Sequence, residues 1–238
     1  MIIRPLQELS EFGKCIELQR QTWGMQDIDL MPARVLLVQT RIGGLVLGAF
    51  DGDRLVGYAS ATPGVRGGTP FWYSQMLAVD KEYRNTSIGF QLKLAQRDHA
   101  LQQGIRMIEW SYDPLESKNA YFNIQKLGVI VRTYHVNLYG ALSSQLQKGL
   151  QSDRVIAEWW LMEPRPQIGG NSRVIYIPAD IQALKKQSLQ SARDVQLRVR
   201  AQFRKNFEDD YFVAAFERTF EWGRYLFVPG ASRVHHGN

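Results

Sequence analysis

The segment Arg84-Asn85-Thr86-Ser87-Ile88-Gly89 holds the residues whose types and spacing point most directly to chemistry. It joins an apolar run, 72–79, to a stretch of about 86–103 whose apolar residues at 88, 92 and 95 follow a helical period. A helix start exposes unpaired N–H groups and the positive end of the helix dipole, so it attracts anions. Small residues let an anion approach the backbone, and the guanidinium of Arg84 suits phosphate. Helix capping by Thr86 or Ser87 explains the same pattern equally well.

The elements that must position this segment follow from hydrophobic periodicity and from turn residues. Pro63-Gly64 and Gly67-Gly68 predict a loop between two strands, and Asp51-Gly52-Asp53 predicts a hairpin turn. Strands are predicted at 2–4, 44–50, 54–62, 72–79, 107–112, 129–138, 155–162, 211–218 and 222–228. Helices are predicted at about 6–22, from Pro32 onward, at about 86–103, 115–127 and 190–208, and in a short stretch from Pro178.

Pro164-Arg165-Pro166 and Gly169-Gly170 form the clearest break in the chain. We therefore expect a main domain over residues 1–166. Residues 167–238 contain too little apolar surface for a separate core. They are expected to form an extension of helix and strands packed on the main body.

The composition predicts a soluble globular protein, because 45% of its 238 residues are apolar and 22% are charged. A free thiol fits a reducing cytosol, so a cytoplasmic protein is expected. The net charge of +6 favours an anionic partner without selecting one. Cys15 is the only cysteine, which excludes an intrachain disulfide and gives no cysteine cluster for a metal. The sequence shows neither a signal peptide nor an apolar run long enough to cross a membrane.

The segment at 84–89 resembles the pyrophosphate loop of the GNAT superfamily of acyl-CoA-dependent N-acyltransferases, whose pattern is Arg/Gln-x-x-Gly-x-Gly/Ala between a strand and a helix. Ser87 stands in place of the first glycine. Asn119-Ala120 and Lys126-Leu127-Gly128 also resemble the asparagine and the "KxG" ending found in that family. The resemblance covers roughly residues 1–162. Within the superfamily, the chain is similar to a bacterial subgroup that carries a C-terminal extension.

The resemblance implies an α/β (α+β) fold in which helices flank a mixed, mostly antiparallel central sheet. Two splayed parallel strands of that sheet would form the CoA cleft. Acyl-CoA, either acetyl-CoA or succinyl-CoA, would be the co-substrate, with no metal. Its contacts would come from the backbone of one splayed strand, from the loop and helix start, and from an asparagine. The implied binding residues are Met76, Leu77, Ala78, Val79, Arg84, Asn85, Thr86, Ser87, Ile88, Gly89, Phe90 and Asn119.

Catalysis of amide formation needs a neutral amine and a proton for the leaving thiolate. Many GNAT enzymes place a tyrosine four residues before the "KxG" glycine, but this position is Ile124 here, so Tyr121 is the nearest substitute. A packed aromatic side chain is the alternative role for Tyr121. Glu109, within an apolar strand, is the candidate base, and a solvent-facing position is its equal alternative. Asp113 and Glu116 follow that strand, where loop capping is the expected role.

The leading hypothesis is therefore an N-acyltransferase that acts on a small-molecule amine, with an amino acid among the candidates, by direct attack in a ternary complex. The alternative is a catalytically inactive CoA-binding sensor, which Ile124 and Ser87 would favour. A nucleic-acid-binding protein is a third reading of the basic helix near the C-terminus, but Asp194, Glu208 and Asp209 dilute its charge. No nucleic-acid or membrane partner is expected, and a homodimer is left open.

Overall fold

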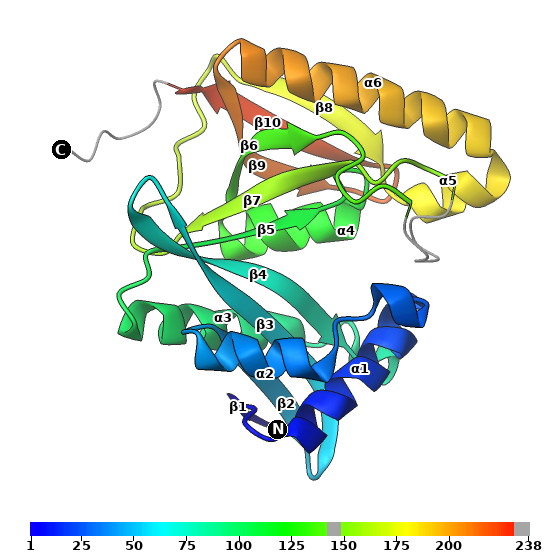
Figure 1. Ribbon diagram of the computed structural model, residues 1–238. Coiled ribbons are helices and arrows are strands. Elements are labelled where there is room, and N and C mark those ends of the chain that lie inside the picture. The colour runs from blue at the N-terminus through cyan, green and yellow to red at the C-terminus, as the bar shows by residue number, and fades with distance from the viewer. Residues whose placement is uncertain (142–148, 231–238) are drawn as a thin grey trace. The chain divides into compact units, whose positions relative to one another are not determined.

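The computed structural model describes residues 1–141 and 149–230 (Figure 1). The helices are α1 (Leu9–Trp23), α2 (Ala33–Arg41), α3 (Ile88–Gln102), α4 (Ser117–Ala120), α5 (Ile181–Gln187) and α6 (Leu189–Glu208). The strands are β1 (Ile2–Pro5), β2 (Leu45–Asp51), β3 (Arg54–Arg66), β4 (Thr69–Val79), β5 (Met107–Tyr112), β6 (Ile130–His135), β7 (Arg154–Trp160), β8 (Arg173–Pro178), β9 (Tyr211–Arg218) and β10 (Trp222–Pro229). Two short 3₁₀ turns, η1 (Asp27–Asp29) and η2 (Lys81–Tyr83), and a π-helix, η3 (Tyr121–Leu127), complete the described elements.

The chain divides into two compact units within β5. Unit 1 contains residues 1–110, and the described part of unit 2 contains residues 111–141 and 149–230. Antiparallel strand pairs, the parallel pair β4–β5 and flanking helices confirm the predicted α/β fold class. Within the described residues, no helix is sufficiently long and apolar to span a membrane.

In unit 1 the strands lie in the order β1-β2-β3-β4-β5. Successive residues of a strand point to opposite faces. Tyr58 of β3 belongs to the apolar core formed with α1 and α2, whereas a Cβ at the preceding Gly57 would meet Ile88 and Leu92 of α3. Thus α1 and α2 cover one face of this sheet and α3 covers the other (Figure 1).

The hairpin of β3 and β4 is longer than predicted. The strand continues through Pro63-Gly64, which the sequence assigned to a loop, and the turn is formed by Gly67 and Gly68 with φ of +56° and +79°. Pairing of β2 with β3 stops at Ala61, so Pro63 lies where β3 has become an edge on that side. A proline without an N–H group is tolerated at such an edge.

Strand β4 carries a β-bulge at Gln75. Ser60 of β3 pairs with Met76, whereas its neighbour Ala61 pairs with Ser74, so Gln75 is the extra residue. A bulge bends its strand and redirects the backbone groups that follow. The following residues, 76–79, are the ones proposed to contact acyl-CoA.

The described part of unit 2 has strands in the order β7-β6-β9-β10-β8, and the helix α6 packs on this sheet. The ring of Phe203 on α6 lies 4.9 Å from that of Tyr225 and 5.1 Å from that of Phe227, in edge-on geometry. The predicted strands at 211–218 and 222–228 correspond to β9 and β10. The sequence did not predict β8, which ends at Pro178 and pairs with β10.

A buried ion pair links α6 to the segment before β7. The side chain of Asp153 is 1% exposed, and its Oδ2 lies 2.9 Å from Nε of Arg200. The carboxylate also accepts the hydroxyl proton of Tyr134 at 2.6 Å and the N–H of Asn137 at 3.0 Å. Each group that contacts this buried carboxylate is therefore fixed in position. Its ion pair with Arg200 stabilises the packing of the C-terminal helix.

We expect Arg200→Met to lower the free energy of unfolding by about 3 kcal/mol, because it leaves the buried Asp153 carboxylate without its cation. Urea unfolding followed by circular dichroism measures this change. Arg204, one turn further along α6, is exposed and serves as the matched control. Arg204→Met should change stability by less than about 0.5 kcal/mol. Equal effects of the two substitutions would show that the ion pair does not hold α6.

Candidate active site

The predicted anion-binding loop is an exposed turn between η2 and α3 in unit 1. Residues 84–87 are exposed, and Asn85 adopts a left-handed conformation with φ of 62°, which asparagine tolerates better than most residues. The hydroxyl of Thr86 donates to the carbonyl of Tyr83 at 2.6 Å. Arg84 donates to the carbonyl groups of Val79 and Thr22, both at 3.4 Å, so the guanidinium lies at the end of β4.

The first turn of α3 presents backbone donors. Ser87 is the N-cap residue but makes no side-chain cap bond, and its hydroxyl instead accepts from Gln91 at 2.9 Å. Among residues 1–141 and 149–230, no acceptor takes the N–H groups of Ser87, Gly89 or Phe90. Such groups, with the helix dipole, suit an anion.

Gly89 has space around it that the protein itself does not fill. A Cβ at this position would meet only Val79 at 3.7 Å and Leu77 at 4.0 Å, which are ordinary van der Waals distances. Its φ does not lie in the left-handed region either. Neither packing nor backbone strain requires glycine here, whereas a closely approaching ligand would favour it.

The strand next to this loop has a free edge after its bulge. Residues 76–79 of β4 pair with β3 on one side. In the described chain, the parallel pairing of β4 with β5 is limited to Trp72 with Ile108 and Tyr73 with Glu109. The edge of residues 76–79 that lies away from β3 thus has no ladder partner among the described residues and is suited to an extended amide-bearing ligand.

The interior of this region contains a buried lysine that the sequence analysis missed. Lys93 is fully buried on the inner face of α3, and its Nζ donates to Ser74 Oγ at 3.0 Å and to Gln96 Oε1 at 2.8 Å. The same Nζ lies 3.6 Å from the ring centroid of Trp110. Burial disfavours the charged ammonium and lowers the pKa of Lys93 well below its usual value. Because Ser74 precedes the bulge residue, Lys93 supports the β4 backbone at the proposed cofactor site.

The predicted base, Glu109, is held by an arginine. It is almost fully buried, and its Oε1 and Oε2 accept from Arg66 Nη2 at 2.7 Å and Nη1 at 2.8 Å. A bidentate pair of this kind occupies both carboxylate oxygens. Glu109 would have to release Arg66 before it could accept a proton. The structure does not test the catalytic prediction, but it gives Glu109 a defined structural partner.

The predicted residues Asn119 and Tyr121 lie in unit 2. Asn119 is exposed on α4, and Tyr121 is half-buried at the start of the π-helix η3. The ring of Tyr121 lies 5.7 Å from Nζ of Lys126. Ile124 is buried, so it belongs to the packing of η3.

The "KxG" glycine ends η3 in the expected way. Gly128 has φ of +81°, and Arg165 donates to the carbonyl groups of Gln125 and Lys126, both at 3.0 Å. Arg165 belongs to the predicted break at 164–170. This segment therefore caps a helix end, a role that its composition did not reveal.

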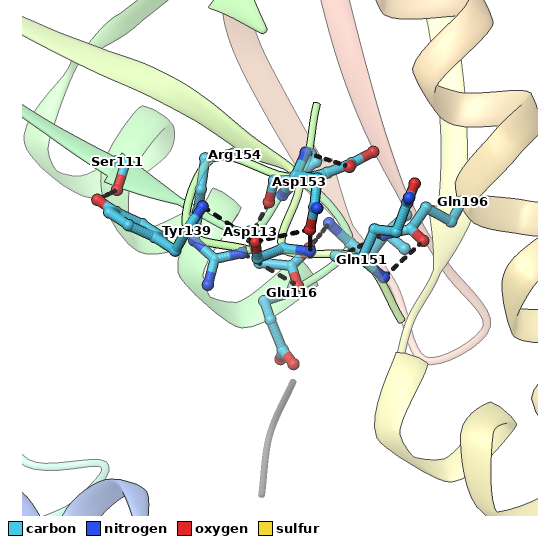
Figure 2. Close-up of polar contacts among 12 residues, drawn as sticks. Ser111, Asp113, Glu116, Tyr139, Gln151, Asp153, Arg154 and Gln196 are labelled. Atoms are coloured by element: carbon cyan, nitrogen blue, oxygen red, sulfur yellow. Dashed lines mark hydrogen bonds and ion pairs between the residues drawn. The ribbon is translucent and has the colours of Figure 1, made fainter. Parts of the chain in front are cut away.

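A polar cluster surrounds the residues that follow β5 in unit 2 (Figure 2). Ser111 Oγ lies 2.7 Å from Tyr139 Oη, and the guanidinium carbon of Arg154 lies 5.4 Å from the centroid of the Tyr139 ring. Asp113 caps its own loop, since its Oδ1 accepts the N–H of Leu115 at 2.8 Å. This capping agrees with the expected role of Asp113 but uses only one of its two oxygens.

Comparison with known proteins gives a family-model match and a similar fold. Residues 13–128 match the model of the acetyltransferase (GNAT) family. The crystal structure of an aminoglycoside 6'-acetyltransferase type Ii has a TM-score of 0.55 and 22% identity, over 69% of this chain and 99% of that one. The ribosomal-protein-S18-alanine N-acetyltransferase of Escherichia coli has a TM-score of 0.54 and 14% identity, over 71% and 97%. An aminoglycoside 6'-N-acetyltransferase complexed with coenzyme A has a TM-score of 0.52 and 19% identity, over 70% and 100%. No curated protein sequence gives a significant match.

We expect the difference in unfolding free energy between Lys93→Met and the parent to depend on pH. Burial in the folded state lowers the pKa of Lys93, whereas the unfolded chain protonates its amine below the ordinary pKa of about 10.4. The parent therefore loses stability as pH falls below about 10, by up to roughly 1.4 kcal/mol per pH unit, until the lowered folded pKa is reached. Urea unfolding of both proteins between about pH 7 and 10 measures this difference. Lys118→Met, at an exposed site, is the control. A pH-independent difference for Lys93→Met would show that Lys93 keeps an ordinary pKa.

Proposed function

We propose that this chain transfers a short acyl group from acyl-CoA to the amine of a small molecule, because residues 13–128 match the model of the acetyltransferase (GNAT) family. Acetyl-CoA is the first candidate donor, and succinyl-CoA is the second. The observation that carries this proposal is the turn at 84–89, where free backbone donors, an arginine and an unconstrained glycine occur together. One aminoglycoside acetyltransferase with the same fold was crystallised with coenzyme A, which supports the donor class.

In this proposal, the pyrophosphate binds the N–H groups of residues 84–89, with Arg84 beside it and Phe90 one turn inside α3. The pantetheine amides bind the free edge of residues 76–79, and Asn119 is a further contact. The donor supplies a thioester carbonyl group that an amine can attack. The chain's own contribution is to hold the donor in one orientation, which Lys93 assists by fixing Ser74 before the bulge.

Direct transfer is the mechanism that the side chains favour. Cys15 is fully buried among apolar residues of α1, and burial raises the pKa of its thiol to about 12. A thiol of this kind supplies almost no thiolate near neutral pH, so a cysteine-linked acyl-enzyme is not supported. The acceptor amine would attack the bound thioester in a ternary complex. Tyr121 or water would provide the proton for the leaving thiolate.

The acceptor is proposed to be a small-molecule amine, with amino acids among the candidates. Structural neighbours include acetyltransferases that act on aminoglycosides and one that acts on an alanine of a ribosomal protein, so a peptide N-terminus belongs in the tests. Residues 167–238 are proposed to act as an extension of the main domain 1–166. Within unit 2, Val213 of β9 pairs with Val131 of β6, and α6 packs on β6. A homodimer is left for measurement.

We expect CoA to raise the melting temperature of the protein, because a ligand bound only by the folded state stabilises it. Arg84→Glu should weaken CoA binding by about tenfold or more, since it replaces a charge-assisted contact with repulsion. Isothermal titration calorimetry gives the two dissociation constants. Lys81→Glu changes net charge equally at an exposed position nearby and should leave binding within about threefold. If Arg84→Glu binds CoA like the parent, the anion site is assigned to the wrong turn.

We expect acyl-CoA and acceptor to give intersecting initial-rate plots, as required for direct transfer. Release of free CoA is followed with a thiol reagent. The panel should cover acetyl-CoA and succinyl-CoA against aminoglycosides, amino acids, polyamines and alanine-initiated peptides. Cys15→Ala should keep kcat/KM within about twofold, because the thiol is inert.

Parallel plots together with loss of activity in Cys15→Ala would contradict direct transfer. CoA binding without turnover of any acceptor would favour the inactive sensor.

A further inference from the structure

The β-bulge of β4 places the side chain of Gln75 on the face of the sheet that α1 and α2 cover. Consecutive strand residues normally point to opposite faces, but here Gln75 and Met76 lie on the same face. Gln75 accepts a hydrogen bond from Gln39 of α2, and Met76 packs against the apolar core formed with α1 and α2. Gln75 is exposed, and it directly precedes the free edge of residues 76–79. The bulge thus presents a polar side chain at one end of the edge proposed to bind the donor.

Hydrogen bonds within unit 1 fix the orientation of the Gln75 amide. Its Oε1 accepts from Nε2 of Gln39 and from the hydroxyl group of Thr62 on β3, the latter at 2.7 Å. Nε2 of Gln39 also donates to Oγ1 of Thr62 at 2.7 Å. On the other face of the sheet, Nζ of Lys93 donates to Ser74, the residue before the bulge. Both the backbone at the bulge and the amide of Gln75 are therefore held in place, as a catalytic group requires.

The amide nitrogen of Gln75 is left available. Because Oε1 faces Gln39 and Thr62, Nε2 occupies the other arm of the amide, and across residues 1–141 and 149–230 it donates to no acceptor. Gln39 is 3% exposed, and its own Oε1 has no donor in the described part of the chain. A buried amide that holds its neighbour but leaves its own oxygen unpaired costs stability, which is more typical of a functional site than of packing alone.

The proposed donor brings its thioester to this amide. With the pyrophosphate at residues 84–89, the pantetheine arm runs along β4 from Val79 to Met76. Four extended residues span roughly 13 Å, which is comparable to an extended arm that contains two amide groups. The sulfur and the acyl group that follow this arm therefore reach the level of Gln75. All of these residues lie in unit 1, so their mutual positions are defined.

Resting on the proposed acyltransferase activity, we propose that Nε2 of Gln75 donates a hydrogen bond to the carbonyl oxygen of the bound thioester. As the neutral amine forms the C–N bond, an electron pair of the C=O bond moves onto that oxygen, and the Gln75 N–H stabilises the developing negative charge. The pair then re-forms the C=O bond while the C–S bond breaks, and the sulfur leaves with the electrons of that bond. The proton lost by the nitrogen ends on the sulfur as free CoA. Gln75 keeps its own protons throughout, so it acts as a neutral hydrogen-bond donor.

The test compares the parent with Gln75→Glu, in which the carboxylate still accepts from Gln39 and Thr62 but cannot donate. The probe is acetyl-CoA labelled with ¹³C at the thioester carbonyl, and difference infrared spectroscopy measures its C=O stretching band in the bound state without turnover. We expect this band at higher frequency in Gln75→Glu than in the parent, because the carbonyl has lost its donor. The matched control is Gln102→Glu, which makes the same change at an exposed position at the end of α3 and should keep the parent band.

Binding and turnover of the same proteins separate the thioester from the rest of the donor. Isothermal titration calorimetry should show that Gln75→Glu weakens acetyl-CoA binding by about fivefold or more, because the lost hydrogen bond is replaced by repulsion. CoA lacks the thioester carbonyl, so its affinity should stay within about threefold of the parent value. With the fastest acceptor of the panel, Gln75→Glu should lower kcat/KM by about 10²-fold or more.

A bound band in the parent at the frequency of S-ethyl thioacetate in a solvent without hydrogen-bond donors would overturn the role of Gln75, even if Gln75→Glu failed to fold. An unchanged band in Gln75→Glu, or equal weakening of CoA and acetyl-CoA, would also overturn it. Each of these results leaves the acyltransferase function standing. A parent that binds no CoA, or that turns over no acceptor, would overturn the proposed function, and the catalytic role of Gln75 would fall with it.

Discussion

A buried carboxylate must be paired with a cation or take up a proton, and this constraint fixes contacts within each unit. In unit 1 it joins Glu109 of β5 to Arg66 at the tip of the β3–β4 hairpin. In unit 2 it joins Asp153 to Arg200 of α6, and Glu158 of β7 to Arg132 of β6. Each pair connects segments that are distant in sequence, so each fixes a long-range contact at a defined register.

The same constraint separates structural from chemical carboxylates. Where a guanidinium approaches both oxygens, as Arg66 approaches Glu109, the charge is satisfied and the group is a poor proton acceptor. Where the guanidinium stays at 4.0 Å, as Arg154 does from Asp113, burial dominates and the affinity for a proton rises. The distance from a buried carboxylate to its cationic partner thus indicates whether it can accept a proton better than its place in an apolar strand does.

Local patterns predicted the elements whose signals lie within a few residues. The strand at 107–112 matches β5, and the turn at 84–89 lies at the start of α3 as expected. The predicted apolar face of that helix, 88, 92 and 95, was incomplete, because Lys93 and Gln96 share the buried side with Ile88 and Leu92. A polar residue that is satisfied in the interior looks like a surface residue in sequence. The pair Arg66–Glu109 spans 43 positions, and no local pattern predicts such a partner.

The burial of Cys15 has a further consequence for how this chain can be observed. It is the only cysteine, and it lies in the core of unit 1 beside Phe12 and Leu18. A thiol-reactive label can modify it only during a local or global opening of that core. The labelling rate of the unaltered protein thus reports the opening equilibrium of unit 1 alone, when closing is faster than modification. Cys15 is thus a built-in probe of the opening of unit 1, and its labelling gives no information on unit 2.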